Sequence, residues 1–227
     1  MRRGSGARRP GGRAILARWR PPARARADRL LDAAIELFAH RGVAATSAGD
    51  VEAAAGLEPG GGAFAAHFAS KRDALAAAID RHVAALDGIT GLLHGGPLAP
   101  DLRAELTLLA RWVIAEHRRE DRLLRILTRE PDAFGDLVAR VGTEIVERGY
   151  REAAAWLARR IAQGGFPPYD AEAVAVVAIG SLVAYDAQRS LLGAPPLGVD
   201  EDRFVATWVE TWLRVAATAE AERDRPS

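Results

Sequence analysis

Apolar side chains recur every three or four residues along most of the chain, which is the spacing of one face of an α-helix. Alternating runs of β-branched residues, which are typical of strands, are scarce. The pattern therefore predicts an all-α fold, and its breaks at glycine and proline divide the chain into about nine helices.

Three short helices are expected first. The first covers residues 24–41 and ends at Gly42, which suits the left-handed backbone that closes many helices. Ser47 is placed to cap a second, short helix, and Asp50 three residues later completes a capping box. After a turn rich in glycine, a third helix is expected over residues 62–69.

Longer helices follow. Ser70 is placed to cap a helix over residues 71–93, with Asp73 as its capping-box partner. Further helices are expected at about residues 100–119, 120–129, 131–163, 171–192 and 201–219. The helix at 171–192 is apolar on most of its sides, so it should be buried within one subunit or between two.

These boundaries predict four segments. An arm over residues 1–22, rich in Arg, Gly and Pro, should be disordered, and a compact three-helix unit covers residues 23–71. A larger helical body covers residues 72–222 and is followed by a tail over residues 223–227. No apolar run is long enough, on this interpretation, to cross a membrane, so no membrane partner is expected.

The net charge of +1 hides a strong asymmetry. Residues 1–29 contain ten arginines and one acidic residue, Asp28, so the rest of the chain is acidic overall. A basic arm on an acidic body fits a polyanionic partner such as nucleic acid, and it also fits a solvated, low-complexity tail. Charge alone leaves both interpretations open.

Residue types with catalytic or metal-binding chemistry form no recognisable group. Cysteine is absent, which excludes disulfides and thiolate metal sites and fits a reducing cytoplasm. The five histidines lack the spacing of metal ligands, and no pairing of a nucleophile with a base can be argued. We therefore expect no metal, no cofactor and no enzymatic activity.

The first three helices form the pattern of a helix-turn-helix. Two short helices joined by a glycine-containing turn follow a longer one, and in such units the second member of the pair enters the DNA major groove. The segment over residues 56–71, "GLEPGGGAFAAHFASK", is then the turn, the recognition helix and the cap of the next helix.

Residues 24–75 resemble the DNA-binding domain of the TetR family of transcriptional regulators. The matching stretches are "LLDAAIELFAHRGVAATS", "DVEAAAGL" and "GAFAAHFASKRDAL", in the order and spacing of the family. The resemblance covers about a quarter of the chain and extends loosely to the rest through the number of helices. It implies a homodimeric repressor that binds a palindromic operator, takes a small-molecule inducer in its C-terminal domain and dimerises through its last two helices.

The glycine-rich turn departs from the family pattern. Five residues, "LEPGG", lie between Gly56 and Gly62 where the family usually has three, and Ala65 stands where the family usually has a tyrosine that touches phosphate. No side chain between residues 59 and 66 can hydrogen-bond a base edge. The turn therefore raises the question of whether this unit reads a base sequence.

Candidate DNA contacts follow from the resemblance and from the helix N-termini, which attract anions. They comprise arm arginines, cap residues, backbone and methyl groups of the recognition segment, and a His67 phosphate contact that could instead be a helix cap. The full set is Arg24, Arg26, Thr46, Ser47, Gly62, Ala63, Ala66, His67 and Lys71. Because the turn offers so few side chains, we expect binding to depend on the basic arm.

Candidate residues in the body rest on aromatic and apolar positions that are more often plain core. A ligand pocket between the fifth and eighth helices would be lined by Trp112, Phe134, Val141 and Tyr185. A dimer interface on the last two helices would include Val177, Ser181, Tyr185, Trp208 and Trp212.

The predicted function is therefore that of a cytoplasmic, ligand-responsive regulator that binds double-stranded DNA. By the resemblance it is a homodimeric repressor released from its operator when a small apolar molecule shifts the connecting helix. The alternative is a helical dimer that binds a small molecule or a protein and whose helix-turn-helix has lost sequence-specific DNA binding.

Overall fold

The computed structural model describes residues 26–94, 96 and 101–223, with the side chains of residues 220–223 left aside. Within these ranges every regular element is helical, so the all-α prediction is confirmed. The arm over residues 1–22, Arg24 and all but the first residue of the predicted tail lie outside the described residues.

Eight α-helices and two short helical turns make up the described chain. The α-helices are α2 (Arg26–Arg41), α3 (Ala48–Ala54), α4 (Lys71–His94), α5 (Leu102–Leu127), α6 (Pro131–Val141), α7 (Arg148–Ala162), α8 (Ala171–Leu192) and α9 (Glu201–Arg223). A π-helical turn, η1 (Gly142–Glu147), joins α6 to α7 without a break, and a 3₁₀ turn, η2 (Pro196–Gly198), lies between α8 and α9.

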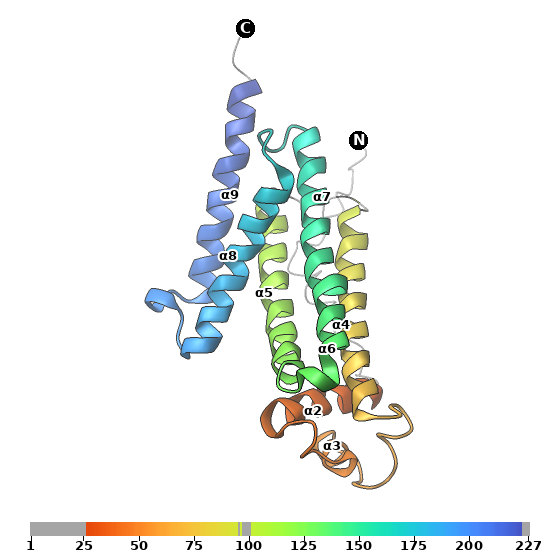
Figure 1. Ribbon diagram of the computed structural model, residues 1–227. Helices are drawn as coiled ribbons and strands as arrows, with labels where there is room; N and C mark the ends of the chain where they lie inside the picture. Colours follow the sequence, from red (N-terminus) through yellow and green to blue (C-terminus); the bar gives the residue numbers. More distant parts are fainter. Residues whose placement is uncertain (1–25, 95, 97–100, 224–227) are drawn as a thin grey trace, which may run out of the picture.

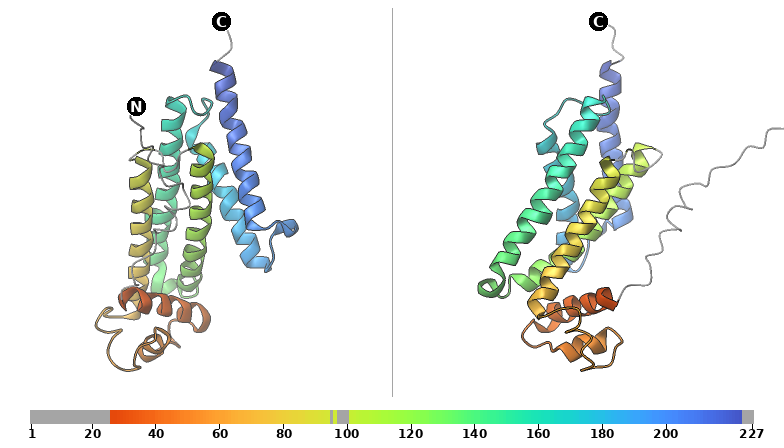
Figure 2. Two further views of the ribbon diagram at one scale, coloured as in Figure 1. Left: turned by 180° about the vertical axis from the view of Figure 1, so that it is seen from behind. Right: turned by 90° about the vertical axis from the view of Figure 1, so that its right-hand side faces the viewer.

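The long helices form an upright bundle with the short helices at one end. Figure 1 shows α4, α5 and α7 side by side, with α2 and α3 beneath them and α8 and α9 on the far side of α5. In the views of Figure 2, α9 runs past the end of the bundle that lies opposite α2 and α3. The helix α4 therefore spans the distance between the N-terminal helices and the middle of the body.

The predicted count of nine helices is too high. The expected helices at 100–119 and 120–129 are one helix, α5, because no glycine or proline separates them and apolar positions such as Leu123 and Leu127 continue the buried stripe. The expected helix at 62–69 is not an α-helix in the described chain, whose backbone there forms only hydrogen-bonded turns. The expected helix at 171–192 has the predicted bounds, and the one expected at 71–93 ends one residue later, at His94.

One apolar core joins the N-terminal helices to the body. Leu30 and Phe38 of α2 are fully buried against Leu75 and Ile79 of α4, in a cluster that also contains Leu127 at the end of α5. The same cluster continues into α6 and η1 through Phe134, Leu137, Val141 and Ile145. Because these side chains share one core, the N-terminal unit is packed rigidly on the end of the bundle.

Polar contacts reinforce this junction at its surface. The Arg72 guanidinium on α4 donates to the Ala133 carbonyl at 2.5 Å and pairs with Asp136 on α6. Further along α4, Asp80 pairs with Arg140 of α6 at a distance of 2.6 Å. These exposed pairs add little stability each, but they fix α4 against α6 along the length that connects the two parts of the chain.

Candidate nucleic-acid interface and ligand cavity

The helix α3 begins with the predicted capping box. The Asp50 amide donates to the Ser47 hydroxyl at 3.1 Å, and the Ser47 amide donates to the Asp50 carboxylate at 2.8 Å. The Ser47 hydroxyl also donates to the same carboxylate at 2.6 Å. Hydrogen bonds from the Ser47 side chain and backbone hold the pKa of Asp50 below its usual value.

A buried glutamate organises the segment after α3. Glu52 is 1% exposed, and its carboxylate accepts hydrogen bonds from the backbone amides of Gly60 at 2.6 Å and Phe64 at 2.8 Å. The hydrogen bond from Phe64 is the main cause that lowers the pKa of Glu52; burial opposes it, and the amides of Gly60, Gly61 and Ala63 add to the lowering. Sequence reasoning missed this anchor, since a glutamate within a short amphipathic helix is usually solvated.

The glycines prevent helical backbone from starting before residue 63 of the recognition segment. Gly60 and Gly62 both have φ of +76°, a left-handed conformation that cannot continue an α-helix. What remains is a single turn, in which the Ala66 amide donates to the Gly62 carbonyl at 3.0 Å and the Phe68 amide to the Phe64 carbonyl at 2.8 Å. The Glu52 carboxylate binds amides at the start of this turn, where a helix would have its own free amides.

Aromatic packing holds the same turn against the core. Phe64 and Phe68 are buried and in contact, with their ring centroids 5.3 Å apart. On the outward side, Gly62, Ala66 and His67 are exposed and Ala63 is half-buried. The turn therefore presents backbone, alanine methyl groups and one imidazole to solvent, which matches the lack of longer polar side chains in the sequence.

The side chains of two residues predicted to contact DNA are engaged in hydrogen bonds within the structure. Thr46 is fully buried, and its hydroxyl donates to the Gly42 carbonyl at 2.9 Å, so a direct contact with DNA would require the loop to open. The Lys71 ammonium donates to the Val43 carbonyl at 2.7 Å, which ties the start of α4 to the loop before α3.

Of the two arginines predicted to contact DNA, only Arg26 is described, and it is exposed at the start of α2. Ser47 is exposed too, although its hydroxyl is engaged in the cap. The predicted contacts that stay available on this face are thus Arg26, Gly62, Ala63, Ala66 and His67.

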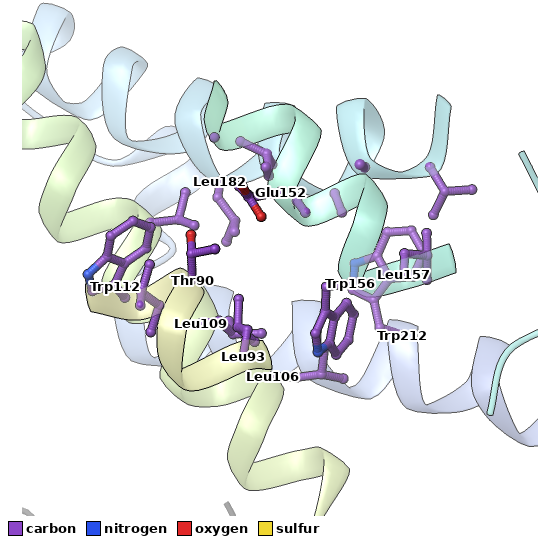
Figure 3. A pocket seen from close by; sticks show the side chains of 18 of the residues that line it. Thr90, Leu93, Leu106, Leu109, Trp112, Glu152, Trp156, Leu157, Leu182 and Trp212 are labelled. Carbon is purple, nitrogen blue, oxygen red and sulfur yellow. The ribbon is translucent and has the colours of Figure 1, made fainter. Parts of the chain in front are cut away.

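A large apolar cavity lies in the middle of the body. Its empty space, the open mouth included, is about 820 Å³. The side chains that line it come from α4, α5, α7, α8 and α9 and from the loop before α8: Leu86, Ile89, Thr90, Leu93, Leu106, Leu109, Trp112, Val113, Gly149, Glu152, Ala153, Trp156, Leu157, Phe166, Val174, Ala175, Ala178, Ile179, Leu182, Trp208 and Trp212. Figure 3 shows this space between the side chains of the surrounding helices. A mostly apolar cavity of this kind is typical of a small-molecule site.

Only one of the four predicted ligand-binding residues lines the cavity. Trp112 lines it, whereas Phe134 and Val141 belong to the core that the body shares with the N-terminal helices. Tyr185 is buried against Phe204, with ring centroids 4.1 Å apart, and its hydroxyl donates to the Val199 carbonyl at 2.9 Å. The prediction failed for these three because spacing within one helix does not tell which side of a multi-helix bundle is hollow.

The two tryptophans that the sequence predicts at a dimer interface lie beside the cavity. Trp208 and Trp212 both line it, and the Trp208 indole donates to the Ser181 hydroxyl at 3.0 Å. Tyr185 is buried within the subunit and is therefore not on an outer face. Of the five predicted interface residues, Val177 is the clearly exposed apolar one, at 63%.

The exposed face of α8 is apolar. Val176 and Val177 are more than half exposed, and so are Leu191 and Leu192 at the other end of the helix. By length and composition alone, α8 could cross a membrane, so the prediction that no segment could do so is wrong for this helix. One such helix is a weak indication, because core helices of soluble proteins pass the same test.

Comparison with known proteins gives one family match. Residues 30–78 match the family described as bacterial regulatory proteins, tetR family. No curated protein sequence matches the chain.

Solved structures match over most of the chain. A protein from Mesorhizobium loti, described as a TetR-family transcriptional regulator, is 20% identical with a TM-score of 0.59, over 84% of this chain and 96% of its own. The fatty acid degradation regulator FadR from Bacillus halodurans is 16% identical with a TM-score of 0.58, over 85% and 96%. The flavonoid-responsive regulator FrrA is 23% identical with a TM-score of 0.53, over 86% and 96%. At these identities the likeness shows the fold alone.

The Glu52 anchor makes a prediction about the recognition turn. Replacing Glu52 with Ala removes the acceptor for the Gly60 and Phe64 amides, so both should exchange with solvent faster by at least about tenfold. Amide hydrogen exchange by NMR measures this directly. Glu58→Ala, at an exposed glutamate of the same turn, is the matched control and should leave both amides unchanged. Unaltered exchange in Glu52→Ala would show that the anchor does not hold the turn.

The same interaction has a defined pH dependence. Because the pKa of Glu52 is lowered from its ordinary value of 4.5, its stabilising effect is fully present above that value and is lost as the pH falls through the folded-state pKa. The difference in unfolding free energy between the wild type and Glu52→Ala should therefore be constant from neutral pH to about pH 5 and shrink below it. Denaturant titrations at several pH values measure the difference, and a pH-independent gap would contradict the assignment.

Proposed function

Because residues 30–78 match the tetR family, we propose that this chain is a transcriptional regulator of that family, a dimeric repressor released from its operator by a small apolar molecule. The observation that supports the ligand response most directly is the position of α4. Its upper half lines the cavity through Leu86, Ile89, Thr90 and Leu93, and its lower half belongs to the shared core.

Because α4 is one helix that contacts both the cavity and the shared core, it couples the cavity to the DNA-binding end. A ligand that fits one position of α4 better than the other shifts the population toward that position. Because Leu75 and Ile79 of α4 are packed against Leu30 and Phe38 of α2, the N-terminal unit moves with the helix. In a dimer this changes the separation of the two recognition turns and the fit to two operator half-sites.

We propose that the dimer forms through α8 and α9. The exposed valines and leucines of α8 are otherwise unfavourable on a surface, and a second copy would bury them. The same burial explains how a helix apolar enough for a membrane span fits a protein of the cytoplasm, which is where we place this regulator.

Filling the cavity should uncouple ligand from DNA. A Cβ at Gly149 would meet no atom within 4 Å, so Gly149→Leu should fold and occupy the cavity from α7. We expect the neutral dye N-phenyl-1-naphthylamine to bind the wild type and lower its affinity for DNA from the region upstream of its own gene. Gly149→Leu should bind the DNA equally well and lose at least about tenfold in dye affinity.

Dye fluorescence and fluorescence anisotropy of labelled DNA measure the two steps separately. Gly135→Leu is the matched control, since Gly135 lies on α6, has similar open space and does not line the cavity. A dye that binds the wild type without changing DNA affinity would contradict release by ligand.

The recognition turn favours a large contribution from the basic arm. The described face offers one imidazole and few cations, whereas residues 1–25 of the sequence contain eight arginines. We expect deletion of residues 1–22 to weaken DNA binding and to reduce the slope of log affinity against log salt by about 0.9 for each phosphate that the arm neutralises in the full chain. Anisotropy titrations across salt concentrations test this, and unchanged affinity and slope would reject the idea.

The second candidate function is a ligand-binding dimer that has lost sequence-specific DNA binding. It is favoured because no side chain between residues 59 and 66 can hydrogen-bond a base edge, which leaves only backbone groups there. A full-length chain that binds its upstream DNA and an unrelated duplex equally at every salt concentration would support this candidate over the repressor.

The proposed dimer is testable at α8. Val177→Asp places a charge on the exposed apolar face and should convert the dimer to a monomer with unchanged helix content. Sedimentation velocity measures the mass, with Leu108→Asp, at a partly exposed leucine of α5, as control. A Val177→Asp variant that sediments like the wild type would place the interface elsewhere.

A further inference from the structure

Two oxygen-bearing side chains interrupt the otherwise apolar lining of the cavity. Thr90 lies on α4 and Glu152 lies on α7. In Figure 3 the oxygens of both side chains point into the same part of the cavity, between Trp112 on one side and Trp156 on the other. The two groups thus form a small polar site on an apolar background.

The Thr90 hydroxyl lacks a partner. The residue is 7% exposed, and its oxygen makes no hydrogen bond among the described residues. A threonine within a helix usually satisfies its hydroxyl on the carbonyl four residues earlier. Five other threonines of this chain do so, namely Thr107, Thr128, Thr143, Thr207 and Thr211. A buried hydroxyl that faces a cavity without a partner is therefore available to a ligand.

The Glu152 carboxylate also has free acceptor capacity. Its side chain is 26% exposed, and its partner among the described residues is His94, whose Nε2 is 3.8 Å away and whose side chain is half exposed. Other carboxylates of the body are held closely by comparison. Glu105 accepts from the Trp156 indole at 3.1 Å and pairs with Arg160.

The tryptophans of the cavity offer flat faces. The indole nitrogen of Trp156 is engaged with Glu105, and that of Trp208 with Ser181 and the Ala178 carbonyl. These two tryptophans, together with Trp112 and Trp212, line the cavity with indole rings, which pack well against another aromatic ring. The lining therefore favours an aromatic body over a flexible aliphatic chain.

We propose that the cavity binds an aromatic molecule that carries one hydrogen-bond-donating group, a hydroxyl or an ammonium, placed between Thr90 and Glu152. The donor is bound by the carboxylate, which only accepts, while the threonine hydroxyl donates to a phenolic oxygen or accepts from an ammonium. A carboxylate on the ligand is disfavoured, because it would lie beside Glu152 in an apolar surrounding. This inference rests on the proposed ligand-binding function and specifies its chemical class.

The test uses four naphthalene probes that differ only in the head group. Isothermal titration calorimetry with the full chain compares naphthalene, 2-naphthol, 2-naphthylmethylammonium and 2-naphthoate. We expect the hydroxyl or the ammonium probe to bind at least about tenfold more tightly than naphthoate, and the stronger of the two identifies the head group.

Substitutions assign the preference to the two side chains. Glu152→Gln should abolish the discrimination against naphthoate, and Thr90→Val, which keeps the shape of the side chain, should weaken the preferred probe by about tenfold. Glu147→Gln and Thr107→Val, at positions outside the cavity lining, are the matched controls and should bind all four probes like the wild type. Thermal unfolding shows that each variant is folded.

Three outcomes would overturn the inference. Naphthoate could bind as tightly as naphthol and the ammonium probe, the preference could survive both substitutions, or no probe could bind. The proposed function fails separately. If the preferred probe binds with the expected selectivity but leaves DNA affinity unchanged, the ligand class holds and release by ligand does not.

Discussion

The apolar contact between α2 and the lower half of α4 is the constraint on which the rest of the structure depends. Leu30 and Phe38 are fully buried there against Leu75 and Ile79, and the core continues into α5 and α6. Without this shared core the N-terminal unit, whose helix α3 has only seven residues, would have little apolar surface of its own to bury. Through it, any displacement of α4 in the body reaches the helix-turn-helix.

The recognition segment depends on a different kind of contact. Its glycines at residues 60 and 62 have a left-handed backbone, and the Glu52 carboxylate holds the turn by accepting hydrogen bonds from backbone amides. Two buried phenylalanines fix the other side. A turn that is ordered in this way but offers few side chains can position a duplex through backbone and phosphate contacts more readily than it can read bases. This is why we propose that the basic arm contributes a large share of the affinity for DNA.

The cavity explains the placement of all four described tryptophans. Trp112, Trp156, Trp208 and Trp212 come from three helices and meet around one space. The same space contains the Thr90 hydroxyl, which has no hydrogen-bond partner among the described residues, and the Glu152 carboxylate, whose ion-pair partner is 3.8 Å away. In an apolar surrounding these two groups are energetically costly unless a ligand uses them, which is why they are informative about ligand chemistry.

Local rules explain what could be predicted from the sequence. The Ser47–Asp50 capping box, the bounds of α4 and α8 and the all-α class follow from periodicity and from contacts within four residues, so they needed no tertiary information. The family resemblance of the N-terminal unit also lies in consecutive residues. Two helices were expected where the structure has only α5, although the charged run between them carries no glycine or proline.

The sequence by itself determined the helices, their caps and the helix-turn-helix pattern, because each is set by neighbours along the chain. Only the tertiary structure decided that Thr46 and Glu52 are buried, that Phe134, Val141 and Tyr185 are core, and that Trp208 and Trp212 face a cavity. Those outcomes depend on which faces of separate helices meet. Periodicity identifies an apolar face, but the packing of five helices decides whether that face closes on another side chain or on an open space.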